Sequence, residues 1–456
     1  MMREAPADDS DSARSRTRPF VALALVCIGV SLSLICIRHP ILKRVTIVAS
    51  VCLALWLTEV VPPYVPTLVL WALTPLLLFG QGDRFSLTQV LGWSANPVLA
   101  LFLGGFALSV AASRYGIDSF IARLAVHWSR GSRLLLLCLT MAATALLSMW
   151  MSNIAAAAMM IAALHPLFFG VKKNDSFRRA LLMGIAISAN FGGIATPIGT
   201  GPNAIAIAAV SSRHPITFTA WMVFALPLAL GLILGGLLLL TARFRVRGTA
   251  RELSAIAAAL PSKGARWVMI VFSLSVVAWL SEPIHGVPAA VVALITTAVL
   301  FGSGLLKHKD LAKIDWSTLL LIAGGIGLGN LLEQGGAIQA ANGSIPWEQL
   351  PHAVRLFALC FASALLSALM SNTAAATILI PLAAGIDPAP STAILIAIAA
   401  SLGIPFVIST PPNAMVYGEG GITFSDLALP GLILMILGCV LVSMTGPFVL
   451  NLAGIP

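Results

Sequence analysis

The chain is built from apolar runs close to the roughly 20 residues that an α-helix needs to cross the hydrocarbon core of a bilayer. The polar stretches between these runs are too short to form a separate soluble domain. Only 10% of the residues are charged, against about 25% in an ordinary soluble domain. The sequence therefore predicts an all-α integral membrane protein. The eleven expected spans are residues 19–37, 45–60, 66–80, 97–113, 178–212, 218–242, 267–282, 287–303, 316–334, 391–417 and 428–451.

Two further apolar blocks, residues 133–171 and 350–386, carry the same phrase. The first contains ALLSMWMSNIAAA (145–157) and the second ALLSALMSNTAAA (364–376), 219 positions later, with ten of thirteen residues identical. A Ser-Asn pair in one apolar helix usually holds neighbouring helices together. Its recurrence at matched positions beside helix-breaking segments favours a functional role.

The 27 Lys and Arg residues indicate how these two blocks lie in the membrane. If each block enters and leaves on one face, 21 of the 27 fall on one side, in the N-terminal tail and four later loops. The positive-inside rule then puts the N-terminus in the cytoplasm, and eleven crossings put the C-terminus outside. Because an odd number of spans separates the blocks, they become re-entrant hairpins of opposite orientation. The sequence thus predicts two inverted repeats.

Two other pairs of segments repeat in the same order. FLGGFAL (102–108) matches IAGGIGL (322–328), and TGPNA (200–204) matches TPPNA (410–414). A Gly-Gly pair such as the one in each of these segments more often allows close helix packing than contacts a substrate. The TPPN segment could be a mere kink, but its repetition favours a site.

Gly/Pro-rich interruptions at residues 192–203 and 403–413 fall inside expected spans, where these residue types break helical hydrogen bonds. An unpaired backbone group in hydrocarbon costs several kcal/mol. Non-helical segments at this depth must therefore be buried in protein or line a water-filled cavity. Inverted repeats with broken helices are typical of secondary transporters with a site at the midplane. We therefore expect the two breaks and the two hairpin tips to share one cavity.

The side chains and backbone groups available to line that cavity are uncharged. An anion would be held by Asn amides, by Ser and Thr hydroxyls and by helix N-termini, each equivalent to about half a positive charge. Freed carbonyls and hydroxyls offer hard oxygen ligands for a small cation such as sodium. Asn153 and Asn372 suit both tasks, because an amide carries a donor and an acceptor.

With these residues the chain resembles the divalent anion/sodium symporter family, which carries dicarboxylates, citrate or sulfate. The resemblance rests on the two Ser-Asn tips, the two breaks, TEVVPPYVPTLVL (58–70) and LFLGGFALSVAASRYG (101–116), and it covers about residues 19–456. It implies a homodimer and an elevator mechanism, in which a transport domain slides against a scaffold domain. The implied scaffold comprises 19–130, with an interfacial helix at 117–130, and 267–349; the transport domain comprises 131–242 and 350–456; 243–266 is a cytoplasmic loop.

The resemblance also implies the site residues, with sodium as coupling ion and no organic cofactor. The first sodium site would use Ser148, Ser152, Asn153 and Gly199, and the second Ser367, Met370, Asn372 and Ser409. The substrate would meet Ser152, Asn153, Thr200, Ser371, Asn372, Thr373, Thr410 and Pro411.

One position departs from the family pattern. The first tip reads Ser-Asn-Ile, so Ile154 stands where the family usually has a threonine. The pocket then has one hydroxyl fewer and a larger apolar wall. This argues against a symmetric dicarboxylate such as succinate and leaves open sulfate or an acid with one apolar end.

Other functions stay open as alternatives. A sodium-independent anion exchanger of the same fold would need internal substrate, and a channel would show no acceleration of uptake by trans substrate. An intramembrane enzyme is disfavoured, because no H-E-x-x-H motif, Cys/His cluster or acidic pair lies in an expected span.

The remaining segments fit a bacterial inner-membrane protein. Residues 1–18 predict a disordered cytoplasmic tail. The net charge of +10 comes from loop residues, so the partners we expect are a small anion, membrane lipid and a second copy, and no nucleic acid. The six cysteines are scattered singly, which is typical of small core residues. Four glutamates at span ends are expected to be solvated or to cap helices: Glu59, Glu282, Glu333 and Glu419.

Overall fold

The computed structural model is all-helical over the residues that it describes. These are residues 9–168, 172–211, 214–248, 262–342, 349–387, 389–452 and 454–455. Parts of the expected tail, of the expected loop 243–266 and of the hairpin block 133–171 lie outside them. Eight described helices are long and apolar enough to cross a membrane, and shorter apolar helices accompany them. The prediction of an all-α membrane protein is therefore confirmed.

The first repeat follows the expected order of elements. Its helices are α1 (Asp9–Cys36), α2 (Pro40–Thr58), α3 (Val65–Leu77), α4 (Leu87–Gly92), α5 (Pro97–Arg114), α6 (Ile117–Trp128), α7 (Arg133–Ser148), α8 (Asn153–Phe168), α9 (Ser176–Gly192), α10 (Gly201–Val210) and α11 (Phe218–Phe244), with short 3₁₀ turns η1 (Asp83–Phe85) and η2 (Gly193–Ala195).

The second repeat mirrors this order. Its helices are α12 (Lys263–Leu280), α13 (Glu282–His285), α14 (Ala289–Gly302), α15 (His308–Leu311), α16 (Trp316–Gln334), α17 (Ala337–Asn342), α18 (His352–Leu369), α19 (Asn372–Ile386), α20 (Pro390–Ala400), α21 (Pro411–Gly418) and α22 (Phe424–Leu452), with the 3₁₀ turn η5 (Val407–Ser409).

Both repeated phrases form the turn of a helical hairpin. α7 packs against α8, and α18 packs against α19. Each second arm begins at the Asn of the phrase, and the preceding Ser caps it: the hydroxyl of Ser152 accepts from the N–H of Ala155, and that of Ser371 accepts from the N–H of Ala374. Ser at this position satisfies an N–H that has no partner within the helix. α18 is long enough to span, but the chain reverses after it.

Glycines let the first arm of each hairpin pack closely on its broken helix. A Cβ added at Gly192 would lie 2.6 Å from the carbonyl oxygen of Ala145 on α7. One added at Gly403 would lie 2.6 Å from the carbonyl oxygen of Ala364 on α18. Ala145 and Ala364 are counterparts in the repeated phrase, so the two hairpins use the same packing.

The GG pairs on α5 and α16 are packing positions, as expected. The first glycine of each pair faces another helix of the expected scaffold, since a Cβ on Gly104 would meet Ala293 of α14 and one on Gly324 would meet Thr67 of α3. The second glycine faces the breaks and hairpins, Gly105 against Ile198 of the first break and Gly325 against residues of α10 and of the hairpin arm α19. α5 and α16 therefore separate two sets of helices.

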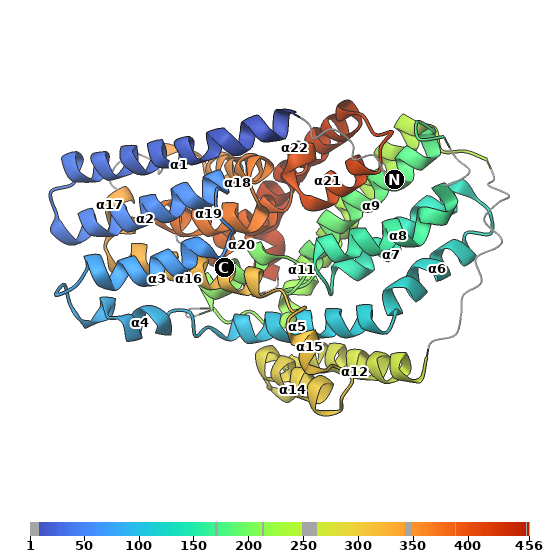
Figure 1. The fold of residues 1–456 in the computed structure, drawn as a ribbon, viewed down its shortest axis with the longest axis horizontal. Coiled ribbons are helices and arrows are strands. Elements are labelled where there is room, and N and C mark those ends of the chain that lie inside the picture. The colour runs from blue at the N-terminus through green and yellow to red at the C-terminus, as the bar shows by residue number, and fades with distance from the viewer. Residues whose placement is uncertain are drawn as a thin grey trace, which may run out of the picture.

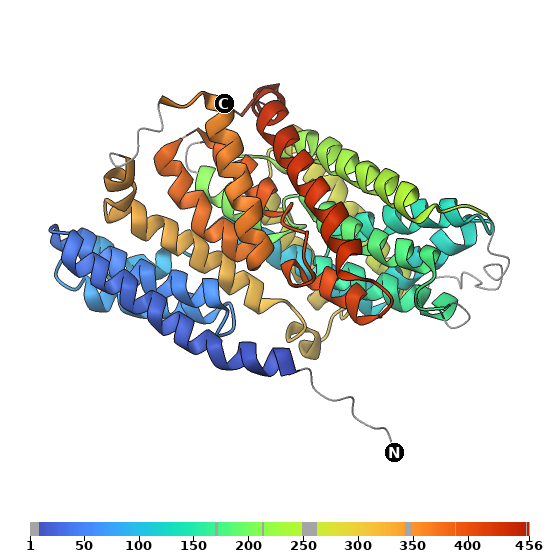
Figure 2. The same cartoon turned by 90° about the horizontal axis from the view of Figure 1, so that it is seen from above.

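The two hairpins lie on different sides of the molecule, α7 and α8 to the right of Figure 1 and α18 and α19 to its left. Helix α22 packs against α11, α18 and α20, and Figure 2 shows it between the orange and the green segments. α1 packs on α2 at the edge of the structure. α1 begins at Asp9, inside the expected tail, because the apolar span propagates helix into the polar residues before it.

Candidate functional site

Each hairpin tip holds its asparagine oxygen by a buried serine of the first arm. The hydroxyl of Ser148 lies 2.8 Å from Oδ1 of Asn153, and the hydroxyl of Ser367 lies 2.7 Å from Oδ1 of Asn372. Both serines are fully buried. The Ser148 hydroxyl also lies 2.5 Å from the carbonyl oxygen of Ala189 on α9. The single hydroxyl proton of Ser148 cannot bond fully to both acceptors at once. The oxygens of Ser148, Asn153 and Ala189 therefore lie close together around one proton, an arrangement in which a small cation can bind.

Each break is stabilised by the asparagine of its own second half-helix. The amide of Asn203 donates to the carbonyl oxygens of Gly193, Ile194 and Thr196 at 3.1, 3.3 and 2.8 Å. The amide of Asn413 donates to those of Ile404 and Phe406 at 2.8 and 2.9 Å. These bonds satisfy backbone oxygens that the broken helix leaves without partners, and they fix the unwound chain in place.

Each hairpin contacts the broken helix of the other repeat. Gly201 opens α10, and a Cβ added there would lie 2.3 Å from the hydroxyl of Thr373 at the second tip. On the other side, α8 packs against α21. The amide of Asn190 on α9 joins the two repeats, because it donates to the Thr410 hydroxyl at 3.1 Å and to Oδ1 of Asn413 at 3.2 Å. Both tips and both breaks thus belong to one assembly.

Helix ends of both polarities meet in this assembly. α8, α10, α19 and α21 begin in it, and their N-termini favour negative charge. α7, α9, α18 and α20 end in it, and their last carbonyl oxygens favour a cation. No group of three or more His, Cys, Asp or Glu that could hold a metal ion occurs among the described residues. A cation here would be held by neutral oxygens.

Comparison with known proteins identifies the family. A sequence model of the citrate transporter family (CitMHS) matches residues 53–394. The chain belongs to the citrate transporter family. An uncharacterized transporter of Methanocaldococcus jannaschii is 31% identical over 420 residues, covering 89% of this chain and 93% of the relative. A sodium-dependent dicarboxylate transporter (SdcS) of Staphylococcus saprophyticus is 26% identical over 441 residues, covering 85% and 82%.

A solved structure has the same fold. The YdaH transporter of Alcanivorax borkumensis superposes with a TM-score of 0.58 at 17% identity, covering 85% of this chain and 99% of that one. The predicted relationship to divalent anion/sodium symporters is confirmed at the level of the family. This citrate transporter family member is a membrane transporter.

The structure places the predicted site residues at the tips and breaks of this assembly. Those that are buried are Ser148, Gly199, Ser367, Met370, Ser409 and Thr410. Those that are partly exposed are Ser152, Asn153, Thr200, Ser371, Asn372 and Thr373, and Pro411 is exposed. Ser409 joins its break to the hairpin, because its hydroxyl donates to the carbonyl oxygen of Ala368 at 2.9 Å.

The residue that departs from the family pattern is well exposed. Ile154 keeps 48% of its surface accessible, whereas its counterpart Thr373 packs on Gly201. An apolar side chain at the first tip therefore faces open space beside the N-terminus of α8.

The two tips, which were expected to share one cavity, line separate ones. A cavity of about 350 Å³ is lined by Ser152 of the first tip together with α5 residues such as Ser109 and Ser113. A second, of about 470 Å³, is lined by Ser371 of the second tip together with Glu59.

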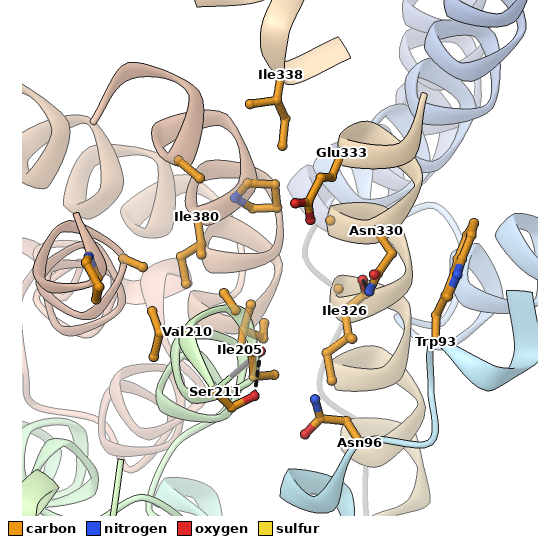
Figure 3. Close-up of a pocket in the computed structure, with 18 of the residues that line it drawn as sticks. Trp93, Asn96, Ile205, Val210, Ser211, Ile326, Asn330, Glu333, Ile338 and Ile380 are labelled. Carbon is orange, nitrogen blue, oxygen red and sulfur yellow. Dashed lines mark hydrogen bonds between the residues drawn. The ribbon is translucent and has the colours of Figure 1, made fainter. Parts of the chain in front are cut away.

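A third cavity, of about 620 Å³, lies between α16 and the helices α10, α19 and α20. Asn330 and Glu333 point into it from α16, opposite Ile380 and Val210 (Figure 3). Its lining contains none of the predicted site residues. It therefore borders the C-terminal half of α19, away from either hairpin tip.

Two asparagines of the assembly were not among the predicted site residues. Asn190 and Asn203 are fully buried, and Oδ1 of each has no hydrogen-bond partner among the described residues. Asn203 could have been found, because it is the repeated Asn of TGPN. Asn190 could not be found by comparing repeats, because Ala400 occupies the corresponding position of the second repeat.

Proposed function

We propose that this transporter carries a small divalent anion, of the dicarboxylate or sulfate class, together with sodium. The observation that supports this best is the gathering of neutral oxygens at the first tip. Oδ1 of Asn153 and the carbonyl oxygen of Gly199 both lie 2.7 Å from the point where a side chain on Gly193 would begin. The absence of a side chain at Gly193 leaves room between these oxygens.

The proposal assigns the two ions to helix ends of opposite polarity. Sodium binds among the hydroxyls and carbonyl oxygens where α7 and α9 end, with Ser148, Asn153 and Gly199, and where α18 and α20 end, with Ser367, Asn372 and Ser409. The anion binds where α8, α10, α19 and α21 begin. Because the two charges lie close together, sodium lowers the cost of removing the anion from water, which couples their movements.

The named relative supports the coupling ion and the substrate class, since SdcS is a sodium-dependent dicarboxylate transporter. We further propose an elevator mechanism, a homodimer and a cytoplasmic N-terminus, with the transport domain formed by both hairpins, both broken helices, α11 and α22. The inverted repeats and the glycine faces of α5 and α16 support a sliding boundary.

Uptake into proteoliposomes tests the proposal. We expect labelled succinate, citrate or sulfate to accumulate when sodium is high outside and to stay near background when choline replaces sodium. Uptake that is independent of sodium but requires anion inside the liposomes would instead identify an exchanger.

Ile154→Thr tests the assignment of the first tip. The change restores a hydroxyl beside the N-terminus of α8 and should strengthen succinate binding by about tenfold, as expected for one added hydrogen bond to a charged group. Competition of succinate against the preferred labelled anion measures the effect. Unchanged competition would show that Ile154 does not line the anion site.

A further inference from the structure

The turns after α2 and α12 are two copies of a further repeated element. Trp56-Leu57-Thr58-Glu59 corresponds to Trp279-Leu280-Ser281-Glu282, 223 positions later. In each copy the indole N–H donates to a backbone carbonyl oxygen beyond the turn, that of Pro63 in the first copy and that of Ala289 in the second, both at 3.0 Å. The two turns therefore repeat in structure as well as in sequence.

In the first copy the glutamate contacts the second hairpin tip. Oε1 of Glu59 accepts a hydrogen bond from the backbone N–H of Ser371 at 3.2 Å, across 312 positions of sequence. Glu59 has φ 48°, a left-handed conformation that a non-glycine residue seldom adopts. Such backbone strain persists only where the surrounding structure fixes it, and it often occurs at functional positions.

In the second copy the glutamate holds the start of α11 beside the first tip. Oε2 of Glu282 accepts from the N–H of Phe218 at 2.9 Å, and Oε1 accepts from the N–H of Ala289 at 3.2 Å. Trp150, at the first tip, stacks on both Phe218 and Trp279 with interplanar angles of 9° and 7°. The first hairpin tip thus lies against the second copy of the element.

The two copies nevertheless make different contacts. Glu59 binds the N–H of Ser371, whereas Glu282 binds the N–H groups of Phe218 and Ala289 and not that of Ser152, the counterpart of Ser371. Since the tip and the glutamate turn both occur once in each half of the chain, the contact that one glutamate makes is available to the other after the halves exchange conformations.

We propose that Glu59 and Glu282 are a pair of positioning residues for the two hairpins. Glu59 holds the tip of the second hairpin in the conformation seen here, and Glu282 holds the N–H of Ser152 in the opposite one. Each carboxylate stabilises one end of the movement of the transport domain. This inference depends on one part of the proposed function, namely that the transport domain moves between two positions.

Cysteine accessibility measures which conformation is populated. In a background that lacks the six native cysteines, one probe cysteine replaces Ser109 in the cavity at the first tip, and another replaces Ala384 in the cavity beside α16. The two cavities lie beside equivalent stretches of α5 and α16, and the one beside α16 is the larger here, at about 620 Å³ against about 350 Å³. The opposite conformation should reverse this order. The rate of maleimide labelling of purified full-length protein gives the ratio of the two conformations.

Glu59→Gln weakens a charge-assisted hydrogen bond of the conformation seen here and should shift the ratio of labelling rates at least about threefold toward the cysteine at position 109. Adding Glu282→Gln should move the ratio back toward that of the parent, because it weakens the opposite conformation as well. Asp83→Asn is the matched control: it removes a carboxylate from an exposed position after α3 and should leave the ratio unchanged.

Two results would overturn the proposal. One is a ratio in Glu59→Gln equal to that of the Asp83→Asn control, and the other is a double variant that behaves like Glu59→Gln alone. If Glu59→Gln does not fold, Glu59→Asp keeps the charge, shortens the reach and should shift the ratio in the same direction. Labelling needs neither sodium nor anion, so it remains informative even if uptake turns out to be independent of sodium.

Discussion

Asn372→Ala is expected to abolish transport while leaving the protein folded. The amide oxygen lies 2.7 Å from the buried hydroxyl of Ser367, and the side chain stands at the first residue of α19. If the same amide serves both sodium and the anion, its removal takes away one polar contact from each. Hydrogen bonds to charged groups contribute about 1.5–3 kcal/mol each, so the loss of two should lower uptake by at least about a hundredfold. Proteoliposome uptake under a sodium gradient measures the loss.

The control for this variant is another amide that lies away from the tips. Asn451 is exposed near the end of α22, and Asn451→Ala should transport normally. Thermal unfolding in detergent adds a second measurement, because a ligand that binds the folded state raises its apparent stability. Sodium should stabilise the parent and the Asn451→Ala protein more than Asn372→Ala, which keeps only the proposed sodium site at the first tip. Near-normal uptake by Asn372→Ala would contradict the assignment of the tip.

The repeated phrases predicted the hairpins because their polar residues coincide with the turns. Ser152 and Ser371 are favourable helix caps as well as polar residues in apolar runs, so local chemistry and the repeat indicated the same positions. The breaks were predicted for a similar reason, since glycine and proline remove helical hydrogen bonds wherever the chain goes afterwards.

Contacts between the repeats could not be predicted in this way. Gly201 lies against Thr373 and Asn190 against Thr410, and each pair joins residues far apart in sequence. A repeat indicates that two segments are alike, but not which of them face each other. Glu59 shows the same limit, because its position at the end of α2 suggested a solvated or capping residue, whereas its carboxylate reaches the second hairpin tip.

Gly193→Ala should selectively impair the response to sodium. Gly193 has φ −61° and ψ −21°, values that alanine adopts without strain, so the effect of the change comes from the added methyl group. That Cβ would lie 2.7 Å from Oδ1 of Asn153 and 2.7 Å from the carbonyl oxygen of Gly199, closer than such atoms can approach. The Asn153 side chain would have to move away from the oxygen of Gly199, and the proposed sodium ligands would separate.

We expect the sodium concentration that half-saturates uptake to rise by about tenfold or more in Gly193→Ala, equivalent to about 1.4 kcal/mol of lost sodium binding. Gly231→Ala is the matched control, because nothing lies within 4 Å of a Cβ added at this position of α11. Alanine there should strengthen the helix by up to about 1 kcal/mol and leave the sodium response unchanged. If both variants respond to sodium like the parent, the oxygens around Gly193 do not bind the coupling ion, and the site must be sought at the second tip.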